Sequence, residues 1–150
     1  MTKLIHREGD IFSTTAKGIA HGVNLRGVMG AGIALQFKNR FPDMYEAYRV
    51  SCQAGELKPG SAYPWHDEAS DLTTYNITSQ IDPGPNASYD LLVRGVVAAL
   101  QHAAFVGIDT IAFPRIGSGI GGLDEELVEV ILTNLAGRSE IDIELWTYKP

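Results

Sequence analysis

Hydrophobic and polar positions follow two different periods along the chain, and they alternate. Short runs rich in branched and aromatic residues predict strands. Longer runs with apolar residues three and four positions apart predict helices. The predicted strands cover residues 3–7, 18–24, 61–65, 72–80, 110–113 and 141–147. Two helices are predicted over residues 33–41 and 43–54, and a third begins after Ser88. A fourth has an apolar face formed by Leu127, Val130, Ile131 and Leu135. This order predicts one α/β domain over residues 1–150, with helices on both faces of its sheet.

Composition supports one globular domain without a disulfide. The 150 residues are 45% hydrophobic and 20% charged, and they include one cysteine, Cys52. The four histidines show no metal-ligand spacing, so we assign no metal and no cofactor. The charged first ten residues do not resemble a signal peptide, and we identify no apolar run long enough to span a bilayer. We therefore expect a cytoplasmic protein with no membrane partner.

The net charge narrows the range of ligands. Twelve basic and 18 acidic residues give a formal charge of −6. Non-specific nucleic-acid binding needs a basic surface, so we do not expect it. A phosphorylated ligand remains compatible with this charge, because free backbone N–H groups can supply the positive field.

Two glycine-rich loops each join a predicted strand to a predicted helix. The first covers residues 27–32, and the second covers residues 117–122 and contains the pattern GxGxxG. Ligands of parallel sheets bind beyond the carboxyl ends of the strands, where both loops would lie. Either loop alone is compatible with a simple tight turn. The pattern in the second loop is that of a dinucleotide-binding fingerprint, so a nicotinamide-dependent enzyme is an alternative. The fingerprint normally lies in the first strand–helix unit, however, and here it lies in the last one. Together the loops predict a site that holds a diphosphate from two sides.

Four side chains near predicted strand ends have both a functional and a structural interpretation. Asp10 could accept a hydrogen bond from an exocyclic amine or form an Asx-turn. His21 could transfer protons or be a hydrogen-bonded core residue. Asn24 could bind a ribose or hold a turn. Trp146 lies on the polar face of the last strand, where its ring could stack on a flat heterocycle or pack under a helix.

Four segments together resemble the macrodomain, a module that binds ADP-ribose. They are GDIF (9–12), AHGVNLRGVMGAGIALQFKNRFP (20–42), NITSQ (76–80) and FPRIGSGIGGLDEELVEVI (113–131). The resemblance covers nearly the whole chain and implies a three-layer αβα sandwich with a mixed central sheet. The implied partner is ADP-ribose, an ADP-ribose derivative or an ADP-ribosylated macromolecule. MGAGIA paired with PRIGSG is similar to the branch that contains the terminal ADP-ribose protein glycohydrolase, the DarG-type antitoxins and the yeast ADP-ribose 1''-phosphate phosphatase.

The resemblance also implies ligand contacts for particular residues. Asp10 would bind the adenine amino group, and the Ile11 backbone would contact the adenine ring. Asn24 would hold the distal ribose, and Trp146 would stack beside the adenine. The two loops would surround the diphosphate and the distal ribose, through Val28, Met29, Gly30, Ala31, Gly32, Ile33, Ile116, Gly117, Ser118, Gly119, Ile120 and Gly121.

The expected reaction depends on where the chain departs from that branch. The glycohydrolases have a lysine after the NITS-like strand, where this chain has SQID (79–82), and the protein-directed enzyme has an aspartate at the place of Gly121. The phosphatase instead resembles this chain at His21, and Asp82 would complete its catalytic pair. We therefore expect hydrolysis at the distal ribose, first of ADP-ribose 1''-phosphate, with His21 and Asp82 as catalytic residues. The alternatives are a reader without turnover, and a hydrolase that removes ADP-ribose from DNA or protein with help from the substrate's own diphosphate.

Overall fold

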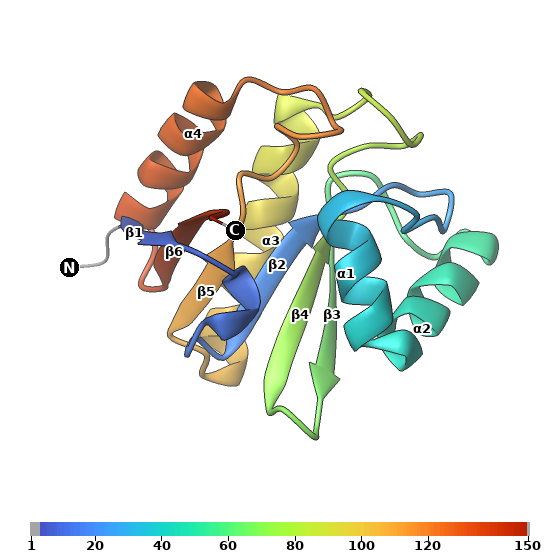
Figure 1. Ribbon diagram of the computed structural model, residues 1–150, viewed down its shortest axis with the longest axis horizontal. Helices are drawn as coiled ribbons and strands as arrows, with labels where there is room; N and C mark the ends of the chain where they lie inside the picture. Colours follow the sequence, from blue (N-terminus) through green and yellow to red (C-terminus); the bar gives the residue numbers. More distant parts are fainter. Residues whose placement is uncertain (1–3, 150) are drawn as a thin grey trace.

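A mixed six-stranded sheet forms the centre of the molecule (Figure 1). The computed structural model describes residues 4–149. The strands are β1 (Leu4–Glu8), β2 (Gly18–Gly22), β3 (Ala62–Asp67), β4 (Leu72–Ile77), β5 (Thr110–Phe113) and β6 (Asp142–Thr147), in the spatial order β1-β6-β5-β2-β4-β3. Only the β3–β4 pair among these strands is antiparallel. The carboxyl ends of β2, β4, β5 and β6 therefore lie at the same edge of the sheet.

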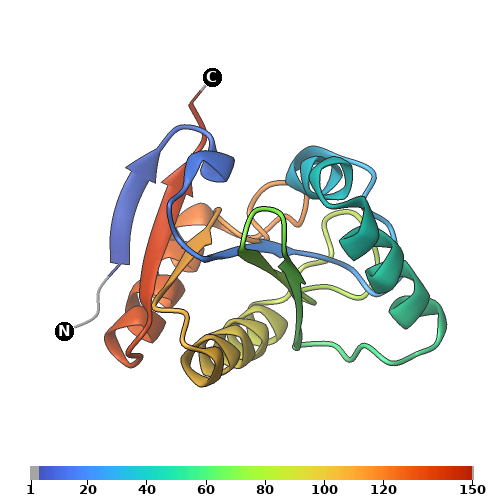
Figure 2. The same cartoon turned by 90° about the horizontal axis from the view of Figure 1, so that it is seen from below.

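Helices cover both faces of this sheet, which confirms the expected three-layer αβα sandwich. The helices are α1 (Gly32–Arg40), α2 (Pro42–Gln53), α3 (Tyr89–Val106) and α4 (Glu125–Gly137), and a short 3-10 helix, η1, spans Ile11–Ser13. In Figure 2, α3 and α4 lie on one side of the sheet, and α1, α2 and η1 lie on the other. Each side has its own cluster of buried apolar residues, with Leu92 and Leu132 in one and Phe37 and Met44 in the other.

The predicted elements match the observed ones except at their ends and on one helix face. The strands predicted over 18–24 and 72–80 end earlier, at Gly22 and Ile77, and a loop follows each of them. Residue 3, the predicted start of the first strand, lies outside the described residues. Half of the predicted apolar face of α4 is wrong: Leu127 and Val130 are 50% and 61% exposed, whereas Ile131 and Leu135 pack against the buried cluster as predicted. The helix is rotated so that Val128, Leu132 and Ala136 face the sheet, four residues apart.

Helix α3 corrects the expectation that no segment could cross a bilayer. By length and composition alone this helix is long and apolar enough to do so, as the core helix of a globular protein also can be. Its buried positions, including Leu92, Val96 and Ala99, pack in the cluster against the sheet. Ser88 caps its first turn, as predicted, by accepting a hydrogen bond from the Leu91 N–H at 3.4 Å.

Candidate functional site

A cavity of about 760 Å³ opens at the carboxyl ends of the parallel strands. Four segments form its walls: the loop after β2, the loop after β4, the loop after β5, and the end of β6. The residues that line it are Gly22, Val23, Asn24, Val28, Gly30, Ala31, Gly32, Ile33, Ala34, Ser79, Gln80, Pro83, Gly84, Pro114, Arg115, Ile116, Gly117, Ser118, Gly119, Ile120, Gly121, Glu125, Trp146, Thr147 and Tyr148. The structure thus brings the two glycine-rich loops to one cavity, at the edge of the sheet where the sequence predicts them.

The two glycine-rich loops also lie close to each other at the cavity. The Cδ1 atom of Ile120 lies 3.4 Å from the position that a Cβ would take on Gly32. Gly32 has a φ of +58° at the first position of α1, which favours glycine. No side chain caps α1 at Ala31, so the first amides of this helix have no side-chain acceptor. These amides and the helix dipole make this corner of the cavity suitable for an anion.

Asn24 holds the first loop in place from the end of β2. Its Oδ1 accepts hydrogen bonds from the Arg26 and Val28 N–H groups at 2.9 and 3.3 Å, and its Nδ2 donates to the Val28 carbonyl at 2.9 Å. The buried Tyr48 hydroxyl lies 2.7 Å from the Asn24 carbonyl oxygen and 3.1 Å from Oδ1. Burial raises the pKa of Tyr48 well above its usual range, so the hydroxyl remains a donor. Asn24 therefore forms the turn, which was one of its two interpretations, and it also lines the cavity.

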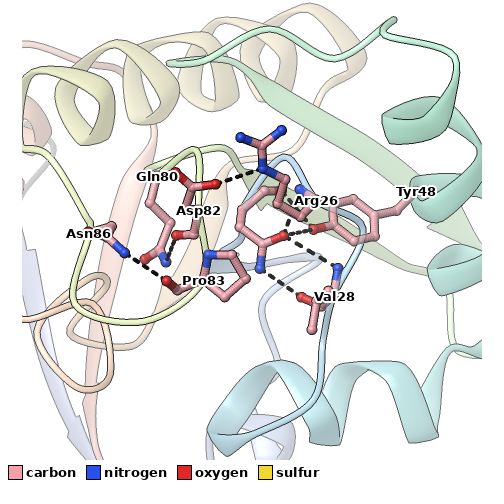
Figure 3. A network of polar contacts seen from close by, with 8 residues as sticks. Arg26, Val28, Tyr48, Gln80, Asp82, Pro83 and Asn86 are labelled. Atoms are coloured by element: carbon pink, nitrogen blue, oxygen red, sulfur yellow. Dashed lines mark hydrogen bonds and ion pairs between the residues drawn. The ribbon is translucent and has the colours of Figure 1, made fainter.

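A hydrogen bond and ion pair between Asp82 and Arg26 joins the loop after β4 to the loop after β2 (Figure 3). Asp82 Oδ1 lies 2.7 Å from Arg26 Nε, and both side chains are more than half exposed. The Gln80 Nε2 group donates to the Asp82 and Gly84 carbonyls at 2.6 and 3.0 Å. Gln80 and Gly84 line the cavity, whereas the carboxylate that was expected to act in catalysis points to Arg26 and does not line it. Asp82 is thus a loop-fastening residue in this structure.

The second loop is tight enough to require glycine. Gly117 has a φ of +77° and its carbonyl accepts the Leu123 N–H at 2.7 Å. A Cβ on Gly121 would lie 2.6 Å from the Gly117 carbonyl oxygen and 2.9 Å from Ala87 Cβ. The backbone of this loop therefore lies directly against the start of α3, and its residues from Gly117 to Gly121 face the cavity.

Trp146, Thr147 and Tyr148 line the cavity from the end of β6. Arg115, which the sequence analysis did not select, lies beside them. Its guanidinium donates to Glu129 at 2.8 Å and to the Thr147 hydroxyl at 3.3 Å, and it lies 3.5 Å from Glu125. Its place in the PRIG segment after β5 was the available signal. Arg115 thus has carboxylate partners and is not a free cation at this end of the cavity.

His21 does not line the cavity, and the catalytic role expected for it finds no support in its surroundings. The side chain is fully buried, with Nε2 2.6 Å from Asn76 Oδ1 and its ring stacked on Phe37 at a centroid distance of 3.7 Å. Burial lowers its pKa from 6.5 to about 4, because the charged ring is poorly solvated there. The structure therefore places His21 as a neutral core residue, which was the alternative interpretation.

This burial makes a prediction for the stability of the protein. The folded pKa is below the unfolded one, so the unfolded chain binds the proton first as the pH falls below about 6.5. We expect the free energy of unfolding to decrease by about 2 kcal/mol between pH 7.5 and pH 5 on account of this residue. Urea denaturation of wild type and His21→Gln measures the difference, with the exposed His6→Gln as control. Equal slopes against pH for wild type and His21→Gln would contradict it.

Three residues with an expected ligand contact also lie outside the cavity lining. Asp10 is exposed, and its Oδ1 accepts the Phe12 N–H at 3.0 Å, which is the Asx-turn alternative. Ile11 and Met29 are buried, with 7% and 1% exposure. Their expected contacts with adenine and diphosphate remain predictions. The other expected ligand-binding residues all line the cavity.

Ser79 begins the SQID segment (79–82), two residues after the end of β4. It is 1% exposed and lines the floor of the cavity beside Gly22, whose own Cβ would lie 2.7 Å from the serine Oγ. Among residues 4–149, the Ser79 Oγ is one of the buried side-chain atoms with no hydrogen-bond partner. The ionisable side chains among the cavity-lining residues are Arg115, Glu125 and Tyr148. The part of the cavity beside Ser79 and Gly22 is therefore lined by small, uncharged side chains.

Comparison with known proteins identifies the class to which this fold and cavity belong. The family model for the Macro domain matches residues 20–132, so the chain belongs to the macrodomain family. It is 32% identical over 145 residues to the 17.5 kDa protein of the tk-vs intergenic region of Enterobacteria phage T4, covering 93% of this chain and 94% of that one.

Other relatives have names that state a reaction. The chain is 31% identical over 149 residues to the DNA ADP-ribosyl glycohydrolase of Mycobacterium tuberculosis, covering 98% of this chain and 42% of the relative. It is 38% identical over 78 residues to the ADP-ribose 1''-phosphate phosphatase of Meyerozyma guilliermondii, covering 47% of this chain and 45% of the relative. The structure of the macrodomain of Mycobacterium tuberculosis DarG superposes with a TM-score of 0.89 at 27% identity, covering 99% of this chain and 100% of that one. The chain thus spans less than half of the glycohydrolase that it resembles.

Proposed function

We propose that this macrodomain binds the ADP-ribose unit of a modified macromolecule and hydrolyses the bond at its distal ribose. The observation that carries the proposal is the meeting of the two glycine-rich loops at one cavity of about 760 Å³, which is the size of a typical small-molecule site. The macromolecule attached to the distal ribose would remain in solvent outside the cavity. Similarity to DNA ADP-ribosyl glycohydrolases over 98% of the chain supports this activity.

Binding would rest on backbone amides and on shape. The diphosphate would lie between the N-terminus of α1 and the second loop, where N–H groups offer positive potential without a lysine. The adenosine end would lie near Trp146, and the distal ribose near Asn24. Contacts with the adenosine diphosphate, remote from the reacting bond, would hold the C1'' atom in place for attack.

The chemistry at C1'' would depend on the substrate as well as on the protein. The ionisable residues among the cavity-lining residues, Arg115, Glu125 and Tyr148, lie on the β5 and β6 side and two of them pair with each other. In the reaction, a water oxygen bonds to C1'', the bond from C1'' to the acceptor breaks, and the acceptor leaves with a proton. A diphosphate oxygen of the substrate would hold that water, accept its proton and pass a proton to the leaving acceptor.

A phosphatase acting on ADP-ribose 1''-phosphate is the second candidate. The partial similarity to the Meyerozyma guilliermondii phosphatase favours it. The two residues expected to carry that reaction, His21 and Asp82, lie outside the cavity lining, so it ranks below release of ADP-ribose from a macromolecule.

A binding measurement and a substrate panel test the proposal. We expect isothermal titration calorimetry to show ADP-ribose binding at a single site. We also expect mass spectrometry to show release of ADP-ribose from ADP-ribosylated DNA or from protein modified on Glu or Asp, at a rate above that of ADP-ribose 1''-phosphate hydrolysis. Absence of ADP-ribose binding at millimolar concentration would refute the proposal entirely. Binding with every substrate left intact would refute turnover and identify a reader, and faster release of phosphate would reverse the two candidates.

A further inference from the structure

A buried carboxylate lies in the middle of β6, outside the machinery described above. Glu144 is 5% exposed on the sheet face that η1 covers. Burying a carboxylate is costly unless its oxygens have partners. Here the Oε1 atom accepts the Thr14 hydroxyl at 2.6 Å and the Trp146 indole N–H at 2.9 Å, and Oε2 lies 3.6 Å from Arg7 Nε. Of these partners, Trp146 lines the cavity, Thr14 lies between η1 and β2, and Arg7 lies on β1.

The first partner is the aromatic ring that lines the cavity. Trp146 and Glu144 are two residues apart on one strand, so their side chains leave the same face of the sheet. The hydrogen bond to Glu144 fixes the edge of the indole that bears Nε1. Its Cζ3 atom lies 3.9 Å from the position that a Cβ on Gly9 would take, so the opposite side of the ring lies near the backbone after β1. The hydrogen bond to Glu144 thus fixes one edge of a ring whose other edge lies beside this backbone.

The second partner belongs to the segment that leads from β1 to β2. The Thr14 Oγ1 atom donates to Glu144 and accepts the Ala16 N–H at 3.0 Å. This holds the end of η1 down on β6, and with it Asp10 and Ile11. One carboxylate oxygen therefore sets the position of Trp146 relative to the segment that carries these two residues. A satisfied buried network of this kind is rigid, because each bond is strong in a medium of low dielectric constant.

We infer that Glu144 is a positioning residue for the base of the ligand. It does not touch the ligand; it sets the plane of the Trp146 indole so that a flat heterocycle such as adenine can stack on it. The inference rests on the proposed function, since it assigns the base end of the ligand to Trp146. It predicts that loss of the carboxylate affects ligands that contain a base and leaves ligands without a base unaffected.

The test uses a Trp65→Phe background, in which Trp146 is the remaining tryptophan of the two in the chain. In Glu144→Leu we expect ADP-ribose to bind about tenfold more weakly, which is about 1.4 kcal/mol. Competition by ribose 5-phosphate, which has no base, should be unchanged. Acrylamide quenching and fluorescence anisotropy should show a more mobile Trp146.

Two control variants accompany this test. Glu144→Gln keeps an acceptor at Oε1, so its affinity for ADP-ribose should lie within about threefold of the background protein. Glu140→Gln, an exposed acidic residue just before β6, is the matched control.

Each outcome separates the inference from the proposed function. If the background protein does not bind ADP-ribose, the proposed function fails. If it binds, and Glu144→Leu is folded with unchanged affinity and unchanged Trp146 fluorescence, the positioning role is refuted and the proposed function stands. Equal weakening of ADP-ribose and ribose 5-phosphate would also refute it. If Glu144→Leu does not fold, Thr14→Val decides: it should raise the mobility of Trp146 and weaken only ADP-ribose, about threefold, and no change would refute the inference.

Discussion

Replacement of Gly121 by valine is expected to weaken ADP-ribose binding at least about 100-fold, the largest effect on the ligand that the structure predicts. A Cβ at this position would lie 2.6 Å from the Gly117 carbonyl oxygen and 3.0 Å from Gly117 Cα, both of them backbone atoms. The loop can relieve this contact only by moving away from the start of α3, where the Gly121 carbonyl accepts the Ala87 N–H at 3.1 Å. The loop amides that we propose to bind the diphosphate would move with it. Calorimetric titration with ADP-ribose measures the loss.

The control for this prediction is Gly137→Val. Gly137 is the last residue of α4, and its added Cβ would have no neighbour within 4 Å. We expect this variant to bind ADP-ribose as wild type does. We also expect Gly121→Val to retain its circular dichroism spectrum, since the loop lies outside the two apolar clusters. Binding by a folded Gly121→Val at wild-type affinity would show that the second loop does not hold the ligand.

Truncation of Phe37 to alanine should lower the free energy of unfolding by about 4 kcal/mol. The ring is fully buried and stacks on His21, and it lies 4.9 Å from the Phe12 ring. It therefore joins α1 to β2 and to η1. Loss of the ring would leave a cavity between α1, β2 and η1. These three elements cannot all move inward to fill it. Urea denaturation at pH 7.5 measures the change.

The same helix supplies a comparison for this measurement. Leu35 is 37% exposed on α1, so Leu35→Ala should cost less than about 1 kcal/mol. A cost below about 2 kcal/mol for Phe37→Ala would mean that the η1 segment repacks over α1. Because α1 begins at Gly32, the truncation should also weaken ligand binding by loosening the N-terminus of this helix.

The sequence was most informative where backbone conformation decides structure. Glycine at 32 and 117 has a positive φ, and both positions could be recognised from their place between a strand and a helix. The strand over 110–113 was predicted with its observed bounds, because a short buried strand is apolar on both faces. The meeting of the loops at one cavity followed from the parallel order of the strands.

Side-chain direction was much harder to predict than element type. His21 and Asn24 are three residues apart near one strand end, yet one is in the core and the other lines the cavity. Asp82 follows a strand that ends at the site, but its partner Arg26 lies on the outside of the loops. On α4 the spacing of apolar residues allowed two overlapping faces, and the cap at Asp124 and the contact with the sheet decided between them. Such differences depend on tertiary contacts that a local pattern does not contain.

Recognition through main-chain N–H groups has a consequence for the conditions under which the domain could work. Peptide groups do not change charge in aqueous solution, and the esterified phosphates of a nucleotide sugar are already anionic in weak acid. A pocket built on lysine or histidine would gain or lose attraction as its side chains titrate. The cavity-lining residues include no lysine or histidine, so the proposed binding of a diphosphate at the corner between α1 and the second loop should vary little from mildly acidic to alkaline media, for as long as the protein stays folded.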